Sequence, residues 1–177
     1  MPVSYEHITA YLVRTAYEDP DHITEYNGAL KMIYTKLTAK AMKTAYNAHH
    51  GQFDRSGAPY IFHPYHLAEQ MTDEYSVCAA LLHDTVEDTD MTFEELEKEF
   101  PKEVTDAVRL LTHEDGTDYF DYVRRLCANP IAKAVKAADL AHNLDISRDT
   151  EGNISPEKRE KLNEKYRKAC DILAGKE

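Results

Sequence analysis

Apolar residues recur along this chain at three- and four-residue spacing, which is the period of one face of an α-helix. The pattern predicts helices over residues 5–17, 23–37, 39–50, 64–72, 76–86, 93–100, 102–112, 119–127, 131–146 and 156–173. Capping signals support two of the starts, at Thr92 with Glu95 three residues on, and at Ser155 before Pro156. No alternating strand pattern exceeds a few residues. We therefore predict an all-α fold, with one compact helical domain over residues 37–177 and a helical extension over residues 1–36.

The longest apolar run, residues 77–82, ends at the polar pair His83-Asp84. Burying a histidine beside an ionised carboxylate costs several kcal/mol unless something compensates, and a divalent cation does so well. Glu87 and Asp88 follow this pair at i+4 spacing, about one helical turn on. The pattern indicates a metal site with further carboxylates beside it, suited to orienting water or moving protons.

Candidate partners for this pair lie on both sides of it in the sequence. His63 precedes Pro64, and Asp139 is followed at i+4 by Asn143 and preceded one turn earlier by Lys136. Histidine nitrogens with carboxylate oxygens suit Mn²⁺, Fe²⁺ or Zn²⁺ better than Ca²⁺ or Mg²⁺. Two alternatives stay open at this point: His63 caps the helix that follows it, or the acidic residues after the pair form a solvated helix end.

Composition narrows the possible partners and the cellular location. The net charge of −11 argues against a nucleic-acid-binding surface, because such binding depends on lysine and arginine neutralising phosphates. No apolar stretch approaches the roughly 20 residues of a membrane span, so no membrane association is expected. The three cysteines lack metal-type spacing, and the first residues lack a signal-peptide pattern. We expect reduced thiols in a cytoplasmic protein.

Three blocks of sequence together resemble a known family. These blocks, residues 48–64, 79–89 and 135–143, are similar to the hydrolase domain of the bifunctional alarmone synthetase/hydrolases and of their small single-domain relatives. That domain belongs to the HD-domain superfamily of metal-dependent phosphohydrolases. The resemblance covers roughly residues 37–146, and residues 157–173 are similar to the closing helix of the small hydrolases. The order and spacing of the three blocks make it specific.

The resemblance implies an HD-domain fold and a set of roles for individual residues. It implies Mn²⁺ as the cofactor, with another divalent transition metal as the alternative, and activation of water by Glu87 and Asp88. The implied metal ligands are His63, His83, Asp84 and Asp139. The residues expected to hold the substrate are Arg55, Lys136 and Asn143.

The implied reaction removes the 3′-pyrophosphate from guanosine tetra- or pentaphosphate. The expected partner is thus a small nucleotide, and residues 1–36 leave a homo-oligomer open. Because no synthetase pattern is present, we expect the chain only to degrade the alarmone.

The chain departs from the family pattern around the substrate. Asp54-Arg55 stands where the family carries Arg-Lys, Asp139-Leu140-Ala141-His142-Asn143 replaces Asp-Arg-Leu-His-Asn, and Asp145 replaces an arginine. Carboxylates do not substitute for the planar arginine fork at a phosphate site. Two alternatives therefore stay open, a hydrolase of another nucleotide or phosphoester and a non-catalytic metal- or nucleotide-binding regulator. His49 and His50 are weighed as metal ligands or as helix-end packing residues, and His66 as a residue beside the metal ligands or an exposed one. His142 is expected to orient the helix or a carbonyl rather than to bind metal, Tyr60 lies beside His63, and Tyr119 and Tyr122 are candidates for the pocket wall.

Overall fold

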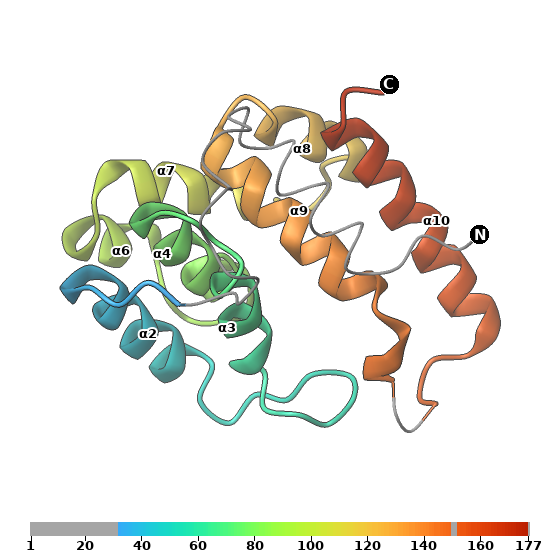
Figure 1. Ribbon diagram of the computed structural model, residues 1–177, viewed down its shortest axis with the longest axis horizontal. Coiled ribbons are helices and arrows are strands. Elements are labelled where there is room, and N and C mark those ends of the chain that lie inside the picture. The colour runs from blue at the N-terminus through green and yellow to red at the C-terminus, as the bar shows by residue number, and fades with distance from the viewer. Residues whose placement is uncertain (1–31, 150–151, 177) are drawn as a thin grey trace, which may run out of the picture.

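The computed structural model describes residues 32–149 and 152–176, and these residues form a helical domain (Figure 1). The helices are α2 (Lys36–Ala48), α3 (Phe62–Ala68), α4 (Glu74–Leu82), α5 (Thr85–Asp88), α6 (Phe93–Glu99), α7 (Lys102–Leu111), α8 (Tyr119–Leu126), α9 (Pro130–Leu144), the 3₁₀ turn η2 (Ile146–Arg148) and α10 (Pro156–Leu173). The described residues contain no β-strand beyond an isolated bridge between Phe53 and Pro59. The all-α prediction is confirmed.

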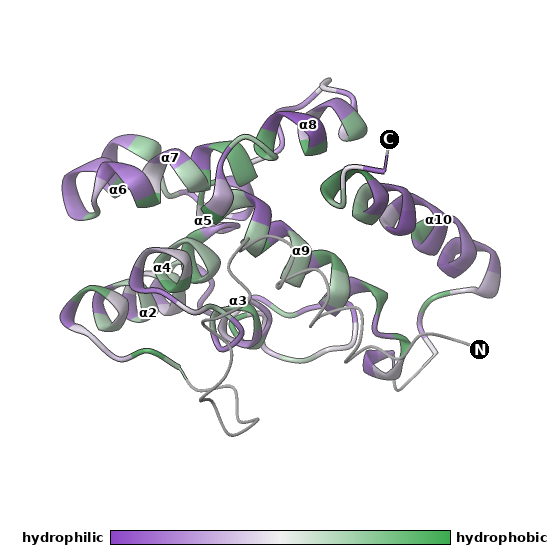
Figure 2. Ribbon diagram, turned by 45° about the horizontal axis from the view of Figure 1, so that its top comes forward, coloured by the Kyte–Doolittle hydropathy of each residue, from purple (hydrophilic) through white to green (hydrophobic). Residues whose placement is uncertain are grey.

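Helix α4 lies at the centre of the domain because it is apolar on nearly every side. Its residues from Ser76 to Leu82 are all buried. A helix without a polar face has to be covered all round, and α4 packs against α2, α3, α7 and α9. The outer helices are hydrophilic on their exposed faces, as Figure 2 shows for α6 and α10. Residues that follow α4 directly are therefore placed at the heart of the molecule.

Helix α9 crosses the middle of the domain and joins its two sides. It packs against α3, α4 and α7 on one side and against α10 on the other (Figure 1). Asn129 caps its start by accepting from the backbone N–H of Ala132, and Pro130 occupies the first turn. Small buried side chains let the neighbouring helices approach closely: Ala132, Ala134, Ala137, Ala138 and Ala141.

Several predicted helix starts are confirmed, and one is wrong. The capping box at Thr92 and Glu95 is present, and Ser155 caps α10. The predicted break between residues 37 and 39 does not exist, because Thr35 caps α2 through the N–H of Thr38. The helix predicted over residues 5–17, and most of the extension predicted over residues 1–36, lie outside the described residues.

The single helix predicted over residues 76–86 is also wrong, since α4 ends at Leu82 and a separate turn, α5, follows. The side-chain hydroxyl of Thr85 donates to the carbonyl of Leu82 at 2.7 Å, and Nδ1 of His83 donates to the carbonyl of Ala80 at 2.8 Å. These bonds satisfy carbonyls that a continuing helix would use. The His83-Asp84 pair therefore sits in a break between two helices. None of the helices in the described part of the chain combines the length and apolar composition that a bilayer crossing needs.

Candidate metal centre

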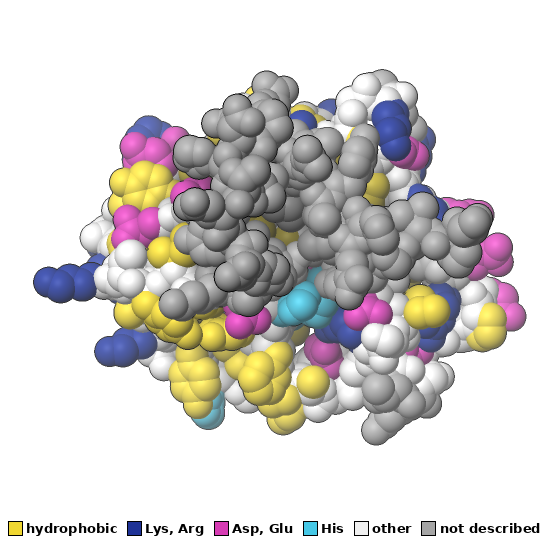
Figure 3. Space-filling model, in the orientation of Figure 1, with side chains coloured by type: hydrophobic (Ala, Val, Ile, Leu, Met, Phe, Trp, Pro, Cys, Tyr) yellow, Lys and Arg dark blue, Asp and Glu magenta, His cyan; other side chains and the backbone are white. Residues whose placement is uncertain are grey.

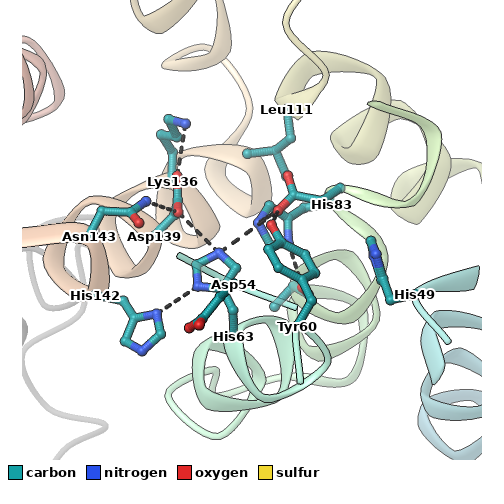
Figure 4. Close-up of polar contacts among 12 residues, drawn as sticks. His49, Asp54, Tyr60, His63, His83, Leu111, Lys136, Asp139, His142 and Asn143 are labelled. Atoms are coloured by element: carbon teal, nitrogen blue, oxygen red, sulfur yellow. Dashed lines mark hydrogen bonds and ion pairs between the residues drawn. The ribbon is translucent and has the colours of Figure 1, made fainter. Parts of the chain in front are cut away.

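Four of the predicted site residues converge from three parts of the chain. His63 lies in the first turn of α3, His83 and Asp84 lie in the break after α4, and Asp139 lies on α9 (Figure 4). Nε2 of His63 is 3.3 Å from Oδ1 of Asp139 and 3.8 Å from Oδ2 of Asp84. Nε2 of His83 is 2.9 Å from the same Asp84 oxygen. The ring of His63 faces this cluster, and Ile61, at the cap position of α3, makes no side-chain capping bond. The capping alternative for His63 is therefore wrong.

The donor atoms of the cluster fit a divalent metal ion. His63, His83 and Asp139 are all buried, and their ligand atoms lie within 4.8 Å of one another. His83 is only 4% exposed, and its Nε2 makes no well-aligned hydrogen bond, although Oδ2 of Asp84 lies 2.9 Å away. A buried polar atom without a well-aligned hydrogen bond is costly, and a bound cation would satisfy it. Oδ2 of Asp84 lies 3.8 Å from Nε2 of His63 and 2.9 Å from Nε2 of His83. Together the four residues offer two nitrogens and two carboxylates, the donor set of a transition-metal site.

Neighbouring side chains hold both carboxylates of the cluster in place. The Tyr60 hydroxyl donates to Oδ2 of Asp84. Asp139 accepts from Nζ of Lys136 at 2.9 Å and from Nδ2 of Asn143 at 2.6 Å. These contacts leave little rotational freedom to either carboxylate, so the cluster is organised before any ligand binds.

The electrostatics keep the central carboxylates ionised. Burial raises the pKa of Asp84, but the adjacent His83 outweighs it and the pKa is lowered. Burial likewise raises the pKa of Asp139. The charge of the buried Lys136 ammonium outweighs the effect of burial and holds this pKa well below its usual range. For His83, burial lowers the pKa, and the charge of Asp84 raises it above its ordinary value. Two ionised carboxylates are therefore present at neutral pH, as a cation site requires.

Three residues of the cluster, His63, Asp84 and Asp139, form part of the wall of a cavity of about 480 Å³, and His83 is buried directly behind them. Figure 3 shows histidine, acidic and basic side chains exposed beside one another near the middle of one face. Glu87 and Asp88 line the cavity, and Oε2 of Glu87 accepts from the backbone N–H of His113 at 2.8 Å. Burial raises the pKa of both carboxyl groups, and the charge of Asp84 adds to this. Both can thus take up a proton more readily than an ordinary carboxylate.

Arginines that the sequence analysis did not assign to the site reach the same cavity. Arg148 of η2 and Arg159 of α10 line it together with Arg55. Oδ2 of Asp54 accepts from Arg148 at 2.8 Å, and its Oδ1 accepts from the N–H groups of Ser56 and Ala58. The charge of Asp54 is therefore paired. Arg148 of η2 thus supplies an arginine to the cavity, although position 54, where the family carries an arginine, is an aspartate.

Lys136 was expected to contact the substrate, but it does not line the cavity. Its ammonium is behind Asp139 and is not on the cavity wall, and it lies 5.3 Å from the ring centroid of Tyr122 and 5.8 Å from that of Tyr119. These tyrosines surround the lysine and do not line the cavity, in contrast to the pocket-wall interpretation. Arg55 and Asn143 do line it. No spacing in the sequence signals Arg148 or Arg159, because their approach depends on how η2 and α10 fold back.

Comparison with known proteins decides the family. The HD domain matches residues 41–168, the region that carries every element of the cluster. The chain belongs to the HD-domain family. The HD domain here is 34% identical over 151 residues to a probable GTP pyrophosphokinase of Mycobacterium leprae, covering 78% of this chain and 18% of that protein.

Two further relatives extend this comparison. The HD domain is 32% identical over 142 residues to the bifunctional (p)ppGpp synthase/hydrolase SpoT of Escherichia coli, covering 72% of this chain and 20% of SpoT. The chain thus spans about a fifth of the length of these curated relatives. Among solved structures, a metazoan orthologue of SpoT described as hydrolysing ppGpp superposes with a TM-score of 0.63 at 29% identity, covering 81% of this chain and 89% of that one. The resemblance inferred from the sequence is confirmed.

Proposed function

We propose that this HD domain is a metal-dependent phosphohydrolase that removes the 3′-pyrophosphate from guanosine tetra- or pentaphosphate. The observation that carries the proposal is the buried cluster at the cavity wall, where the Nε2 atoms of His63 and His83 converge with two ionised carboxylates. The substrate class is supported by the similarity to SpoT and to the metazoan ppGpp hydrolase.

The proposed metal ligands are the four clustered residues, and Mn²⁺ is the proposed ion. Mixed nitrogen and oxygen donors suit Mn²⁺. When bound, such an ion supplies Lewis-acid polarisation of a phosphoryl oxygen and acidifies water. The residues concerned are His63, His83, Asp84 and Asp139.

The chain's own side chains supply the proton transfer and the substrate contacts. Glu87 and Asp88 are exposed in the cavity, and their raised pKa values suit them to accept a proton from the attacking water. Arg55 and Asn143 line the cavity and are proposed to contact the nucleotide. Lys136 is proposed to act through Asp139, whose carboxylate it orients and keeps ionised.

A second candidate is a hydrolase of another nucleotide or phosphoester. It is favoured by Asp54 and Asp149, whose ion pairs with Arg148 and Arg159 offset the charge of these arginines. Asp145 also lines the cavity, so the substrate end is less basic than an alarmone site needs. A non-catalytic regulator is disfavoured, because Glu87 and Asp88 in the cavity would have no evident use in a binding module.

The test is a turnover assay of metal-depleted protein with guanosine tetraphosphate, with and without Mn²⁺, beside a panel of ordinary nucleotides and NADPH. The proposal predicts Mn²⁺-dependent release of pyrophosphate and GDP. Glu87→Gln should bind Mn²⁺ as the wild type does, yet lose about 100-fold or more in turnover, the usual contribution of a positioned acid or base. Cleavage of a panel member with no reaction on the alarmone would support the second candidate. No turnover of any compound would contradict both hydrolase assignments.

A further inference from the structure

His63 is the one histidine of the metal cluster whose second ring nitrogen is bound by another side chain. Its Nε2 faces Asp139 and Asp84, while its Nδ1 lies 2.6 Å from Nδ1 of His142 (Figure 4). Nδ1 of His83, by contrast, is fixed by the backbone carbonyl of Ala80. The orientation of His63 therefore depends on the side chain of His142.

The hydrogen bond between the two rings fixes their tautomers once Nε2 of His63 binds a cation. A neutral imidazole that binds through Nε2 carries its proton on Nδ1. His63 must then donate, and Nδ1 of His142 must accept. The planes of the two rings are only 16° apart and their centroids are 4.8 Å apart, so the acceptor lone pair can point along the N–H bond.

His142 is itself held in place from several directions. Its side chain is buried, and the ring of His66 packs against it with a centroid separation of 4.5 Å. Its backbone carbonyl accepts from Nη1 of Arg148 at 3.3 Å, and Arg148 is bound to Asp54. A buried acceptor with fixed surroundings can impose an orientation on its partner.

We propose that His142 is a positioning residue that fixes the tautomer and ring orientation of His63 and thereby sets the metal affinity of the site. The inference rests on the proposed function, because it assigns His63 as a metal ligand. His142 follows Asp139 by three residues on α9, so this helix supplies one carboxylate and also orients the histidine contributed by α3. Partners of metal-bound histidines generally contribute 10- to 100-fold to metal affinity.

The experiment compares the Mn²⁺ affinities of metal-depleted wild type and three variants by isothermal titration calorimetry. In His142→Asn the side-chain oxygen stands near the position of Nδ1, whereas in His142→Gln it stands near that of Nε2. His142→Leu has no acceptor. We expect affinity to fall roughly 10- to 100-fold in the Leu and Gln variants, and Asn to recover most of this loss. His50→Leu, a change at an exposed histidine outside the cluster, should bind as the wild type does.

The outcomes separate this inference from the proposed function. Thermal unfolding of the metal-depleted proteins checks that each variant folds, and the Asn and Gln pair suffices if the Leu variant does not. Wild-type affinity in the Gln variant, or an equal loss in the Asn and Gln variants, would overturn the role of His142 and leave the metal site standing. Failure of the wild type itself to bind Mn²⁺ would overturn the proposed function, and this inference with it.

Discussion

His83 and Asp84 form the centre of the proposed metal site. Their chemistry could be predicted because a histidine and a carboxylate after a buried apolar run are costly without a compensating cation. The hydrogen bonds that orient the two carboxylates could not be predicted. That Tyr60 donates to Asp84, and that Lys136 lies behind Asp139, follows from how α3 and α9 pack, which residue spacing does not show.

The proton on His83 gives a prediction about pH. Burial lowers its pKa, but Asp84 outweighs this and raises the pKa to about 9, so His83 is protonated at pH 7.5 in the metal-free protein. A metal ligand must be neutral, so binding has to displace this proton. Apparent Mn²⁺ affinity should therefore rise as pH increases from 6.5 towards about 9. Calorimetry at pH 7.5 in buffers of different ionisation enthalpy should show proton release, and buffer-independent enthalpies would refute this protonation state.

At the scale of elements, the helices could be predicted better than their ends. Apolar periodicity runs through residues 76–86 and so predicts one helix, yet the Thr85 hydroxyl and the His83 ring take up backbone carbonyls and end α4 at Leu82. Such local side-chain bonds are invisible to periodicity. At this break Asp84 lies on the cavity wall, and His83 is buried beside it.

The loop before α3 is tied to η2 by one ion pair, and this gives a second prediction. Asp54→Asn keeps an oxygen for the N–H groups of Ser56 and Ala58 but loses the charged bond to Arg148. In a double-mutant cycle of Asp54→Asn with Arg148→Gln, chemical denaturation should give a coupling of about 1 kcal/mol, at the upper end for a partly exposed pair.

Asp54→Ala also loses the turn bonds and should cost about 1 kcal/mol more than Asp54→Asn. Because Arg148 lines the cavity, the Asn variant should also raise KM while Mn²⁺ affinity stays near the wild-type value. Zero coupling together with an unchanged KM would show that this ion pair does not organise the cavity.

For the whole molecule, helical periodicity and composition suffice to predict an all-α domain, and the three sequence blocks suffice to predict its HD-domain family. They do not predict the cavity, whose wall combines α3, α5, α9, η2 and α10. The net charge of −11 also gave no indication that Arg55, Arg148 and Arg159 face the same cavity. Global charge describes the whole surface, whereas a cleft depends on a few local groups.

The central claim is that the His/Asp cluster holds a divalent metal ion. The most direct measurement is an anomalous difference map, collected at the manganese absorption edge from crystals grown with Mn²⁺. We expect one strong peak per chain, in contact with Nε2 of His63 and of His83 and with the carboxylates of Asp84 and Asp139, and no such peak in Asp84→Ala crystals. A map without a peak at the cluster, or with its only peak elsewhere, would contradict the account.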